Sequence, residues 1–308
     1  MRSKFILATR GSPLALAQAN LVKGEIERRS PGVVIEILKI KTSGDLILDR
    51  PLRTVGGKGL FVKEIEEALL AKKADFAVHS MKDVPSEIPK GLKIGVILKR
   101  EDPADVLLSK KHSSLCQLPQ GAIVGTSSLR RKLQLERLRP DLKVQDLRGN
   151  VDTRIKKMNE GLYDAVILAF AGLKRLGREL EAKEKLPFIG APGQGAIGIE
   201  YREEDVELIR ILQPLNDDLT ARCVQAERVI LKNLEGGCEL PLGAEASLVK
   251  GRLCLKAFLS DPEGTQFLED EVEGDPGEAC ALGESLTEKL MRRGANKILE
   301  EIRKIKKT

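Results

Sequence analysis

The sequence predicts two α/β domains followed by a smaller α+β domain with an antiparallel sheet. Short apolar runs alternate with amphipathic helical stretches through the first two thirds of the chain, which is typical of α/β domains. A strand–helix series starts afresh after the charged segment KREDP at 99–103. Beyond Cys238, three segments of alternating polarity indicate an antiparallel sheet.

The first elements follow from local cap and turn signals. Residues 5–8 are expected to form a strand, and Ser12 is expected to cap a helix that has Pro13 at its first position. The other elements expected before the charged segment are a strand at 33–40, a flexible loop at 56–59 (GGKG), a helix at 60–72 and strands at 76–79 and 94–98.

The second series continues the same pattern. It is expected to contain a strand at 122–125, a helix that begins at Ser127 or Ser128, a strand at 143–147, a helix capped by Asn150, and a strand at 165–169 followed by a helix. The Pro/Gly-rich segment at 187–195 marks a second boundary. The elements expected after it are helices at 203–212 and 219–234, strands at 246–249, 253–259 and 267–272, and a last helix at 277–304.

Composition excludes several classes of protein. The 308 residues suffice for two or three domains, and 42% apolar with 32% charged residues is typical of a soluble globular protein. No apolar run approaches the roughly 20 residues that a membrane span needs. The apolar run at 5–8 is too short for the core of a signal peptide, so we expect a cytoplasmic protein without a membrane partner.

The numbers and spacing of cysteine and histidine argue against disulfides, metal sites and a Ser-His-Asp triad. The five cysteines include no C-x-x-C pair, which argues against a disulfide framework and a zinc site. With only two histidines, a metal site or a Ser-His-Asp triad is not expected. The net charge of +6 indicates an acidic partner, but 3% aromatic residues offer little for stacking on nucleic-acid bases.

Basic residues stand where strands end and helices start. In VGTSSLRRK, hydroxyls and free backbone N–H groups precede Arg130 and Arg131 in the first helical turn. A helix N-terminus attracts anions and disfavours cations, so two arginines there make sense if an anion binds. The alternative is an ordinary solvated first turn.

The same placement recurs at three other strand ends. Arg148 and Arg154 flank the turn in DLRGNVDTR, Arg175 follows the next strand, and Arg10 ends the first. Arginine forks bind carboxylates bidentately, so the recurrence favours a cleft for carboxylates or phosphates. GGKG lacks the P-loop pattern and no G-x-G-x-x-G follows a strand, so a nucleotide cofactor is not indicated.

Two further segments leave alternatives open. Asp83 in HSMKDVP can act as an acid or base or stabilise a developing cation, although spacing alone favours a surface ion pair with Lys82. In LEGGCELPLG, Cys238 follows two glycines on a loop, and an accessible thiol or a small buried apolar side chain are equally compatible with it.

Nine motifs in order closely resemble the porphobilinogen deaminase family, also called hydroxymethylbilane synthases. They are LATRGSPLALAQA, KTSGDLILDRPL, GGKGLFVKEIE, ADFAVHSMKDVP, VGTSSLRRKLQL, LRGNVDTR, ILAFAGLKRLG, GQGAIGIE and LEGGCELPLGA. The resemblance runs from about residue 6 to residue 247 and is looser beyond.

The resemblance implies a transferase of porphyrin, heme and other tetrapyrrole biosynthesis. A dipyrromethane cofactor would be joined by a thioether to Cys238. Four porphobilinogen molecules would then be added head to tail with loss of ammonia, and water would release the linear tetrapyrrole hydroxymethylbilane. The family implies a monomer. Every pyrrole would carry an acetate and a propionate group, which would account for the arginines. A nucleic-acid partner is then not expected, in agreement with the small number of aromatic residues.

The resemblance also assigns residues. Asp83 matches the catalytic aspartate, and Lys58 matches a mobile-loop lysine. Thr54 stands where some members have a lysine. The residues that match cofactor- or substrate-binding positions are Arg10, Ser12, Lys58, Ser80, Lys82, Thr126, Ser128, Arg130, Arg131, Arg148, Arg154, Arg175 and Gln194.

The family fold has three domains, the first two similar to periplasmic binding proteins. Its implied boundaries are 1–98 with 196–214 for domain 1, 103–190 for domain 2 and 218–308 for domain 3. Two rival functions stay open: a two-lobed anion-binding receptor or effector domain without catalysis, and a nucleic-acid binder indicated by charge alone.

Overall fold

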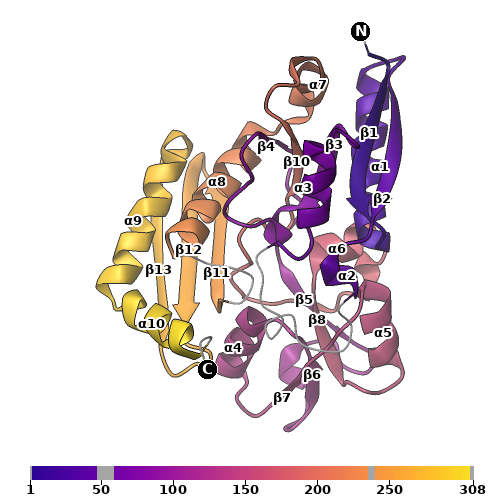
Figure 1. Ribbon diagram of the computed structural model, residues 1–308. Coiled ribbons are helices and arrows are strands. Elements are labelled where there is room, and N and C mark those ends of the chain that lie inside the picture. Colours follow the sequence, from indigo (N-terminus) through magenta and orange to yellow (C-terminus); the bar gives the residue numbers. More distant parts are fainter. Residues whose placement is uncertain (1, 47–58, 235–239, 306–308) are drawn as a thin grey trace. The chain divides into compact units, whose positions relative to one another are not determined.

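The structure is a computed structural model that describes residues 2–46, 59–234 and 240–305 (Figure 1). The chain divides into two compact units, Met1–Glu101 with Gly195–Ala221 and Asp102–Gln194 with Arg222–Thr308. Lys58, Thr54 and Cys238 lie outside the described residues. The three-domain boundaries expected from the family stay a prediction.

The first unit contains a five-stranded mixed sheet in the order β2-β1-β3-β10-β4. Its strands are β1 (Lys4–Arg10), β2 (Val34–Ile40), β3 (Phe76–Ser80), β4 (Leu92–Ile97) and β10 (Ile197–Arg202). β1 runs parallel to β2 and β3, whereas β10 is antiparallel to both of its neighbours. Figure 1 shows β10 beside β3 and β4, although its colour marks a much later part of the sequence.

Helices cover both faces of this sheet. α1 (Pro13–Arg29) and α7 (Val206–Leu212) contribute to one apolar cluster, and α3 (Lys63–Leu70) contributes to the other. The one-turn helix α2 (Ser43–Leu46) follows β2. The predicted cap is confirmed, because the Ser12 hydroxyl accepts a hydrogen bond from Ala15 N at 3.3 Å.

The second unit repeats this strand order as β7-β6-β8-β5-β9. Its strands are β5 (Asp105–Ser109), β6 (Ile123–Gly125), β7 (Lys143–Gln145), β8 (Ala165–Ala169) and β9 (Glu184–Lys185). β6 is parallel to β7 and β8, and β5 is antiparallel to β8 and β9. In each sheet the fourth strand in this order, β10 or β5, is the first strand that the chain forms after it enters that unit from the other one.

Local caps also fix the helices of this sheet. They are α4 (Leu129–Leu138), α5 (Val151–Asn159) and α6 (Phe170–Arg175). Ser128, rather than Ser127, caps α4 by accepting from Arg131 N at 3.4 Å, and Asn150 caps α5 by accepting from Thr153 N at 2.8 Å.

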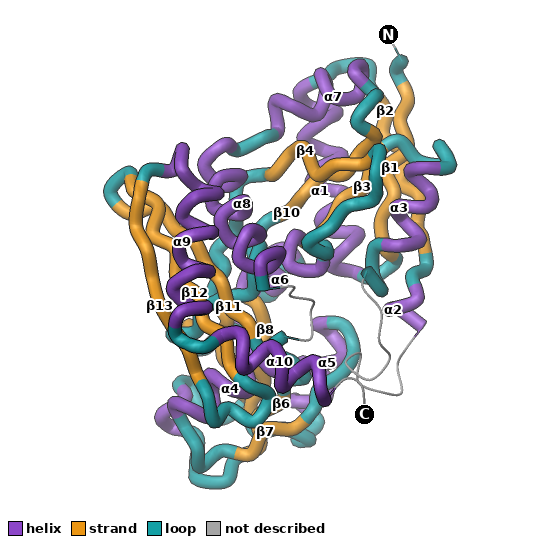
Figure 2. Tube along the Cα trace, turned by 60° about the vertical axis from the view of Figure 1, so that its left-hand side comes forward, coloured by secondary structure: helices purple, strands orange, loops and turns teal. Residues whose placement is uncertain are grey.

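The C-terminal part of the second unit is a three-stranded antiparallel sheet with helices on one face. The sheet has the order β11 (Leu242–Val249), β12 (Arg252–Ser260), β13 (Phe267–Gly274), and it shares one core with α8 (Asp218–Asn233), α9 (Ala279–Arg292) and α10 (Ala295–Ile305). Figure 2 shows α9 running along this sheet. The predicted architecture, two α/β sheets with helices followed by a smaller antiparallel C-terminal sheet, is confirmed.

Two details differ from the sequence-based prediction. The single last helix expected at 277–304 is wrong, because Gly294 has a φ of 106° and separates α9 from α10. β5 and β10 were not predicted at all. Both are buried along their whole length, yet they contain charged residues, Asp105 in β5 and Glu200 and Arg202 in β10, so neither has the continuous apolar run that indicates a buried strand.

Replacing Gly198 in β10 by Ala tests the packing beneath the HSMKD turn. A Cβ there would lie 2.2 Å from Met81 Sδ and 3.0 Å from Ile94 Cγ2, and Met81 is 2% exposed. We expect Gly198→Ala to lower the free energy of unfolding by about 1–3 kcal/mol in urea titrations.

The matched control is Gly24→Ala in α1, where a Cβ meets nothing within 4 Å. Because Ala favours a helix over Gly, this change should raise stability by up to about 1 kcal/mol. Equal stability of both variants would contradict the packing argument.

Candidate active site

In the second unit, the predicted binding residues lie at one edge of the sheet. β6, β7 and β8 are parallel, so their carboxyl ends meet there. Thr126 to Arg131 follow β6, Arg148 follows β7, and Arg175 ends the helix after β8. β5 runs the opposite way, which brings its first residue, Asp105, opposite Ala169 at the same edge.

Hydroxyl groups organise the turn between β6 and α4. Thr126 Oγ1 accepts from Ser128 N at 3.2 Å. Ser127 Oγ donates to Leu147 O and accepts from Leu147 N, both at 2.9 Å. These bonds tie the first turn of α4 to the segment that precedes Arg148, so both arginine-bearing segments have fixed backbones.

A carboxylate that the sequence did not reveal lies at the centre of this edge. Asp105 is fully buried, and its Oδ2 forms an ion pair with Arg130 Nη1 at 2.6 Å. Its Oδ1 receives Arg131 Nη2 at 2.7 Å and Nε at 2.9 Å, and also Gln194 Nε2 at 2.9 Å. The structure therefore brings together three of the predicted binding residues on one acidic group.

The charges of this cluster are strongly coupled. Burial raises the pKa of Asp105, but the neighbouring guanidinium groups of Arg130 and Arg131 outweigh burial and hold that pKa well below its ordinary value. Asp105 is thus ionised at neutral pH. Two guanidinium groups and one carboxylate leave one net positive charge at the edge, which favours an anionic ligand.

The remaining predicted residues of this unit differ in their surroundings. Arg148 is half-buried, and its side chain makes no hydrogen bond or ion pair with residues in the described ranges. Arg154 Nε donates to Gly149 O at 2.8 Å, and Gly149 has a φ of 113°, which a glycine adopts without strain. Among the residues that the structure describes, none neutralises the guanidinium of Arg148.

In the first unit, the predicted residues likewise follow parallel strands. Arg10 ends β1, whereas Ser80, Lys82 and Asp83 end or follow β3. Met81 N donates to Ala196 O at 3.0 Å, and Val84 N donates to Met81 O at 3.2 Å. The backbone on both sides of Asp83 is fixed by these bonds.

The carboxylate of Asp83 is half-buried and open. No other residue in the described part of the chain forms a hydrogen bond or ion pair with it. The surface ion pair with Lys82 that spacing alone favoured is not among the contacts of Asp83. A rigidly carried carboxylate with free oxygens can stabilise a developing positive charge or exchange a proton with a ligand.

Arg10, by contrast, is already held by a carboxylate. Its Nε lies 3.1 Å from Asp45 Oδ1, its Nη2 contacts the same oxygen, and its Cζ lies 4.1 Å from the centroid of the Phe61 ring. Burial raises the pKa of Asp45, but hydrogen bonds from Arg10 and Thr42 outweigh it and lower that pKa. A ligand carboxylate at Arg10 must therefore compete with Asp45.

A second buried charge cluster lies beneath α3. His79 Nε2 is 2.9 Å from Glu200 Oε2, and both side chains are buried. The arrangement agrees with a structural role for His79. Burial, and secondly the negative charge of Glu200, raise the pKa of Glu66 on α3 to about 7.

Sequence reasoning missed two acidic side chains that hold predicted binding residues, Asp105 and Asp45, and one buried amide in α1, Gln18. Gln18 Nε2 is buried in α1 without a hydrogen-bond partner within the described ranges. A buried amide donor without a protein partner is costly unless a water molecule or another group accepts its hydrogen bond. No sequence signal distinguished these residues, because each becomes notable only through neighbours that folding supplies.

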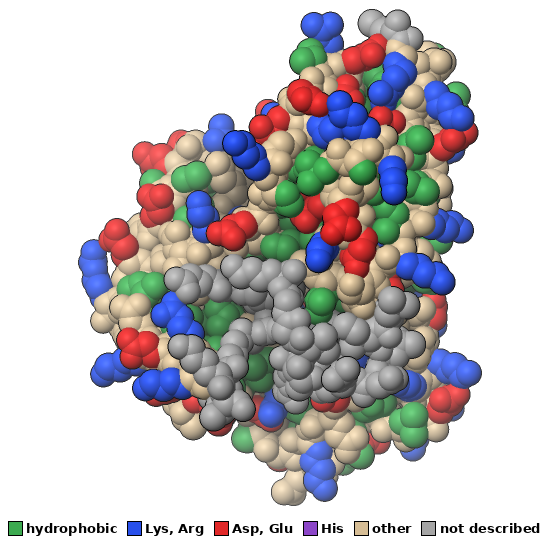
Figure 3. All heavy atoms as spheres, viewed as in Figure 1, with side chains coloured by type: hydrophobic (Ala, Val, Ile, Leu, Met, Phe, Trp, Pro, Cys, Tyr) green, Lys and Arg blue, Asp and Glu red, His purple; other side chains and the backbone are tan. Residues whose placement is uncertain are grey.

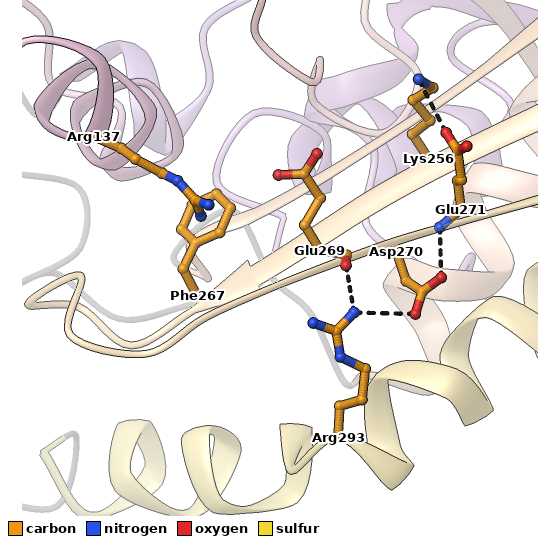
Figure 4. A pocket seen from close by; sticks show the side chains of 7 residues that line it. All are labelled: Arg137, Lys256, Phe267, Glu269, Asp270, Glu271 and Arg293. Carbon is orange, nitrogen blue, oxygen red and sulfur yellow. Dashed lines mark hydrogen bonds and ion pairs between the residues drawn. The ribbon is translucent and has the colours of Figure 1, made fainter.

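One open cavity of about 450 Å³ lies in the second unit between α4 and the C-terminal sheet (Figure 4). Arg137 stacks on Phe267, Lys256 pairs with Glu271 at 3.0 Å, and Arg293 pairs with Asp270 at 3.1 Å. Its basic groups already have protein partners, so it is a poor site for an anion.

Other ligand classes find little support in the described residues. No cluster of three or more His, Cys, Asp or Glu side chains there could hold a metal ion. No helix among them is both long and apolar enough to cross a membrane. On the face shown in Figure 3, basic and acidic side chains are interspersed rather than gathered by sign.

Two family models match the chain. The model described as porphobilinogen deaminase, dipyromethane cofactor binding domain, matches residues 5–210, and the model described as porphobilinogen deaminase, C-terminal domain, matches residues 221–292.

The chain is also similar to solved structures of two periplasmic proteins. A periplasmic substrate-binding protein of an ABC transporter from Coxiella burnetii is 16% identical, with 69% of this chain and 92% of that chain covered and a TM-score of 0.42. The periplasmic VFT2 domain of BvgS from Bordetella pertussis is 17% identical, with 68% and 84% covered and a TM-score of 0.39. Similarity at this level adds nothing to what the two sheets show by themselves.

The buried cluster beneath α3 gives stability a defined pH dependence. Because the pKa of Glu66 rises from 4.5 to about 7 on folding, the folded state binds its proton more tightly. The free energy of unfolding should therefore fall as pH rises from about 4.5 to about 7. Glu66→Gln should remove this fall in urea titrations across that range.

The control is Glu67→Gln, because Glu67 is the exposed neighbour on the same helix. That variant should keep the pH profile of the unchanged protein. A Glu66→Gln profile parallel to that of the unchanged protein would contradict the role assigned to Glu66.

Proposed function

The chain belongs to the porphobilinogen deaminase family, and from that premise we propose that it is a hydroxymethylbilane synthase. The match of residues 5–210 to the dipyrromethane cofactor-binding domain supports a transferase of tetrapyrrole biosynthesis. In the proposed reaction, four porphobilinogen molecules are joined head to tail with loss of ammonia, and water releases hydroxymethylbilane. The match of the cofactor-binding domain carries this proposal.

The residues at the edge of the second unit fit a group that bears several carboxylates. The Asp105 cluster retains one net positive charge, and Arg148 adds a guanidinium that no described neighbour neutralises. Arginine forks bind carboxylates bidentately. The dipyrromethane, when bound, supplies the pyrrole carbon to which porphobilinogen units are added, and we assign its attachment to Cys238.

Asp83 is the proposed catalytic residue. Its carboxylate has no described partner and its backbone is fixed, so its charge is available to a ligand. We assign to it stabilisation of the positive charge that develops on a pyrrole nitrogen as the amino group leaves. It also accepts or returns the proton that this step moves.

The remaining assignments concern carboxylate binding. In the first unit, Arg10 can take a ligand carboxylate in exchange for Asp45, so its guanidinium stays paired with a carboxylate before and after the exchange. Such exchange keeps the cost of desolvating the guanidinium low. Further proposed binding residues are Ser12, Lys58, Ser80, Lys82, Thr126, Ser128, Arg130, Arg131, Arg148, Arg154, Arg175 and Gln194.

The rival function is a two-lobed anion receptor without catalysis. Such a receptor would use the arginines but would need neither a thiol at Cys238 nor an unpaired carboxylate at Asp83. The cytoplasmic location and the monomeric state stay predictions.

The mass of the purified protein separates these functions. We expect the intact chain to carry an adduct of two pyrrole units, and Cys238→Ser to lack it. Cys254→Ser is the control, because Cys254 is a half-buried cysteine in β12. An unmodified chain that stays inactive with porphobilinogen would exclude the proposed function.

Replacing Asp83 by Asn tests its catalytic role. The side chains are alike in size and Asp83 has no described polar partner, so the free energy of unfolding should change little. Turnover of porphobilinogen should fall by roughly 10²-fold or more, because a charge that acts in the transition state is lost. Glu203→Gln, at an exposed carboxylate of the same unit, should leave turnover unchanged; a similar loss there would contradict a specific role.

A further inference from the structure

Three predicted binding residues share a single buried carboxylate. Asp105 has no exposed surface, and Arg130, Arg131 and Gln194 all contact it within 2.9 Å. Asp105 belongs to strand β5, which pairs antiparallel with β8 on one side and with β9 on the other. Its position is therefore set by the sheet and not by the turn that carries the arginines.

We propose that Asp105 is a positioning residue, which fixes Arg131 and holds the guanidinium group of Arg130 in the geometry that receives a carboxylate of the dipyrromethane. The proposal rests on the function proposed above. It assigns Asp105 an action through the arginines and no contact with the cofactor itself.

Electrostatics requires a counter-charge at this place. Arg130 and Arg131 are consecutive residues of the first turn of α4, where the helix dipole already disfavours cations. Both side chains are only 6% exposed, so water does little to screen their mutual repulsion. The Asp105 carboxylate makes it possible to bury both groups and still leaves one positive charge for a ligand.

The contacts also decide which guanidinium edge remains available. Arg131 uses Nε and Nη2 on Asp105 and Nη1 on Ile167 O at 3.0 Å, so all three nitrogens are engaged. Arg130 uses only Nη1, on Asp105 and on Ile189 O at 2.7 Å. Its Nε and Nη2 donate no hydrogen bond to a described residue, and together they form an edge suited to a bidentate carboxylate.

Gln194 closes the arrangement. Its Nε2 donates to Pro103 O at 2.6 Å and to Asp105 Oδ1 at 2.9 Å. The amide thus ties the carboxylate of Asp105 to the backbone carbonyl of Pro103. In this geometry Gln194 acts on the arginines through Asp105, which gives a physical role to a residue that sequence resemblance placed in the site.

Asp105→Asn is the direct test, because it keeps the shape and removes the charge. We expect the fraction of purified chain that carries the dipyrromethane adduct to fall roughly 10-fold or more, as when a supporting partner of a binding group is lost. Assembly from porphobilinogen in the apo-protein should need a correspondingly higher concentration. The adduct is read by intact mass and the fold by thermal unfolding.

Asp261→Asn is the matched control. Asp261 is also a buried aspartate, 3% exposed, and it accepts from Thr265 Oγ1 at 2.6 Å and Gln266 N at 2.7 Å in the C-terminal hairpin. This variant should lose thermal stability and keep the full adduct. A fully modified Asp105→Asn protein, or equal adduct loss in both variants, would overturn the proposal.

A double variant distinguishes the positioning of Arg130 from the net charge of the cluster. It also provides a second test if the single variant does not fold. Asp105→Asn with Arg131→Gln removes one charge of each sign, so Arg130 still supplies one net positive charge. If Asp105 positions Arg130, the adduct stays low in this double variant; full recovery of the adduct would overturn the proposal. An unmodified native chain would remove the proposed function, and this inference with it.

Discussion

The arrangement at the carboxyl edge of the second sheet depends on one buried ion cluster. Two guanidinium groups at a helix start, both almost fully buried, could not persist without the Asp105 carboxylate between them. The same carboxylate receives Gln194, which lies where the chain leaves this unit. The single carboxylate of Asp105 therefore links the proposed carboxylate-binding arginines at the start of α4 to the point where the chain passes from the second unit to the first.

Local signals in the sequence were sufficient for much of the fold. Ser12 and Asn150 cap the predicted helices because a cap depends only on residues a turn away. β5 and β10 escaped prediction because their partners lie far along the chain and both of their faces are buried. The break at Gly294 escaped because a single glycine is tolerated in many helices, and only its backbone conformation shows that this one ends α9.

The residues of the candidate site likewise fall into those that the sequence revealed and those that it did not. Arginines at strand ends were recognisable because each strand, turn and helix start is continuous in sequence. Their acidic partners were not, since Asp105 and Asp45 lie 26 and 35 positions from the arginines they hold. These partners distinguish the arginines from one another: Arg148 has no hydrogen-bond or ion-pair partner among the described residues, Arg10 is paired with Asp45, and Arg131 binds Asp105 and Ile167 through all three of its nitrogens.

The strand order has a consequence for how the chain is made. β4 pairs with β10 alone, so the N-terminal sheet stays incomplete until residues beyond 197 have left the ribosome. All five strands of the other sheet lie within 102–194 and emerge earlier. A nascent chain can therefore complete its middle part before its beginning, the reverse of the usual N-terminal-first order. During that interval β3 and β4 present unpaired edges, which makes it the period of greatest exposure to aggregation.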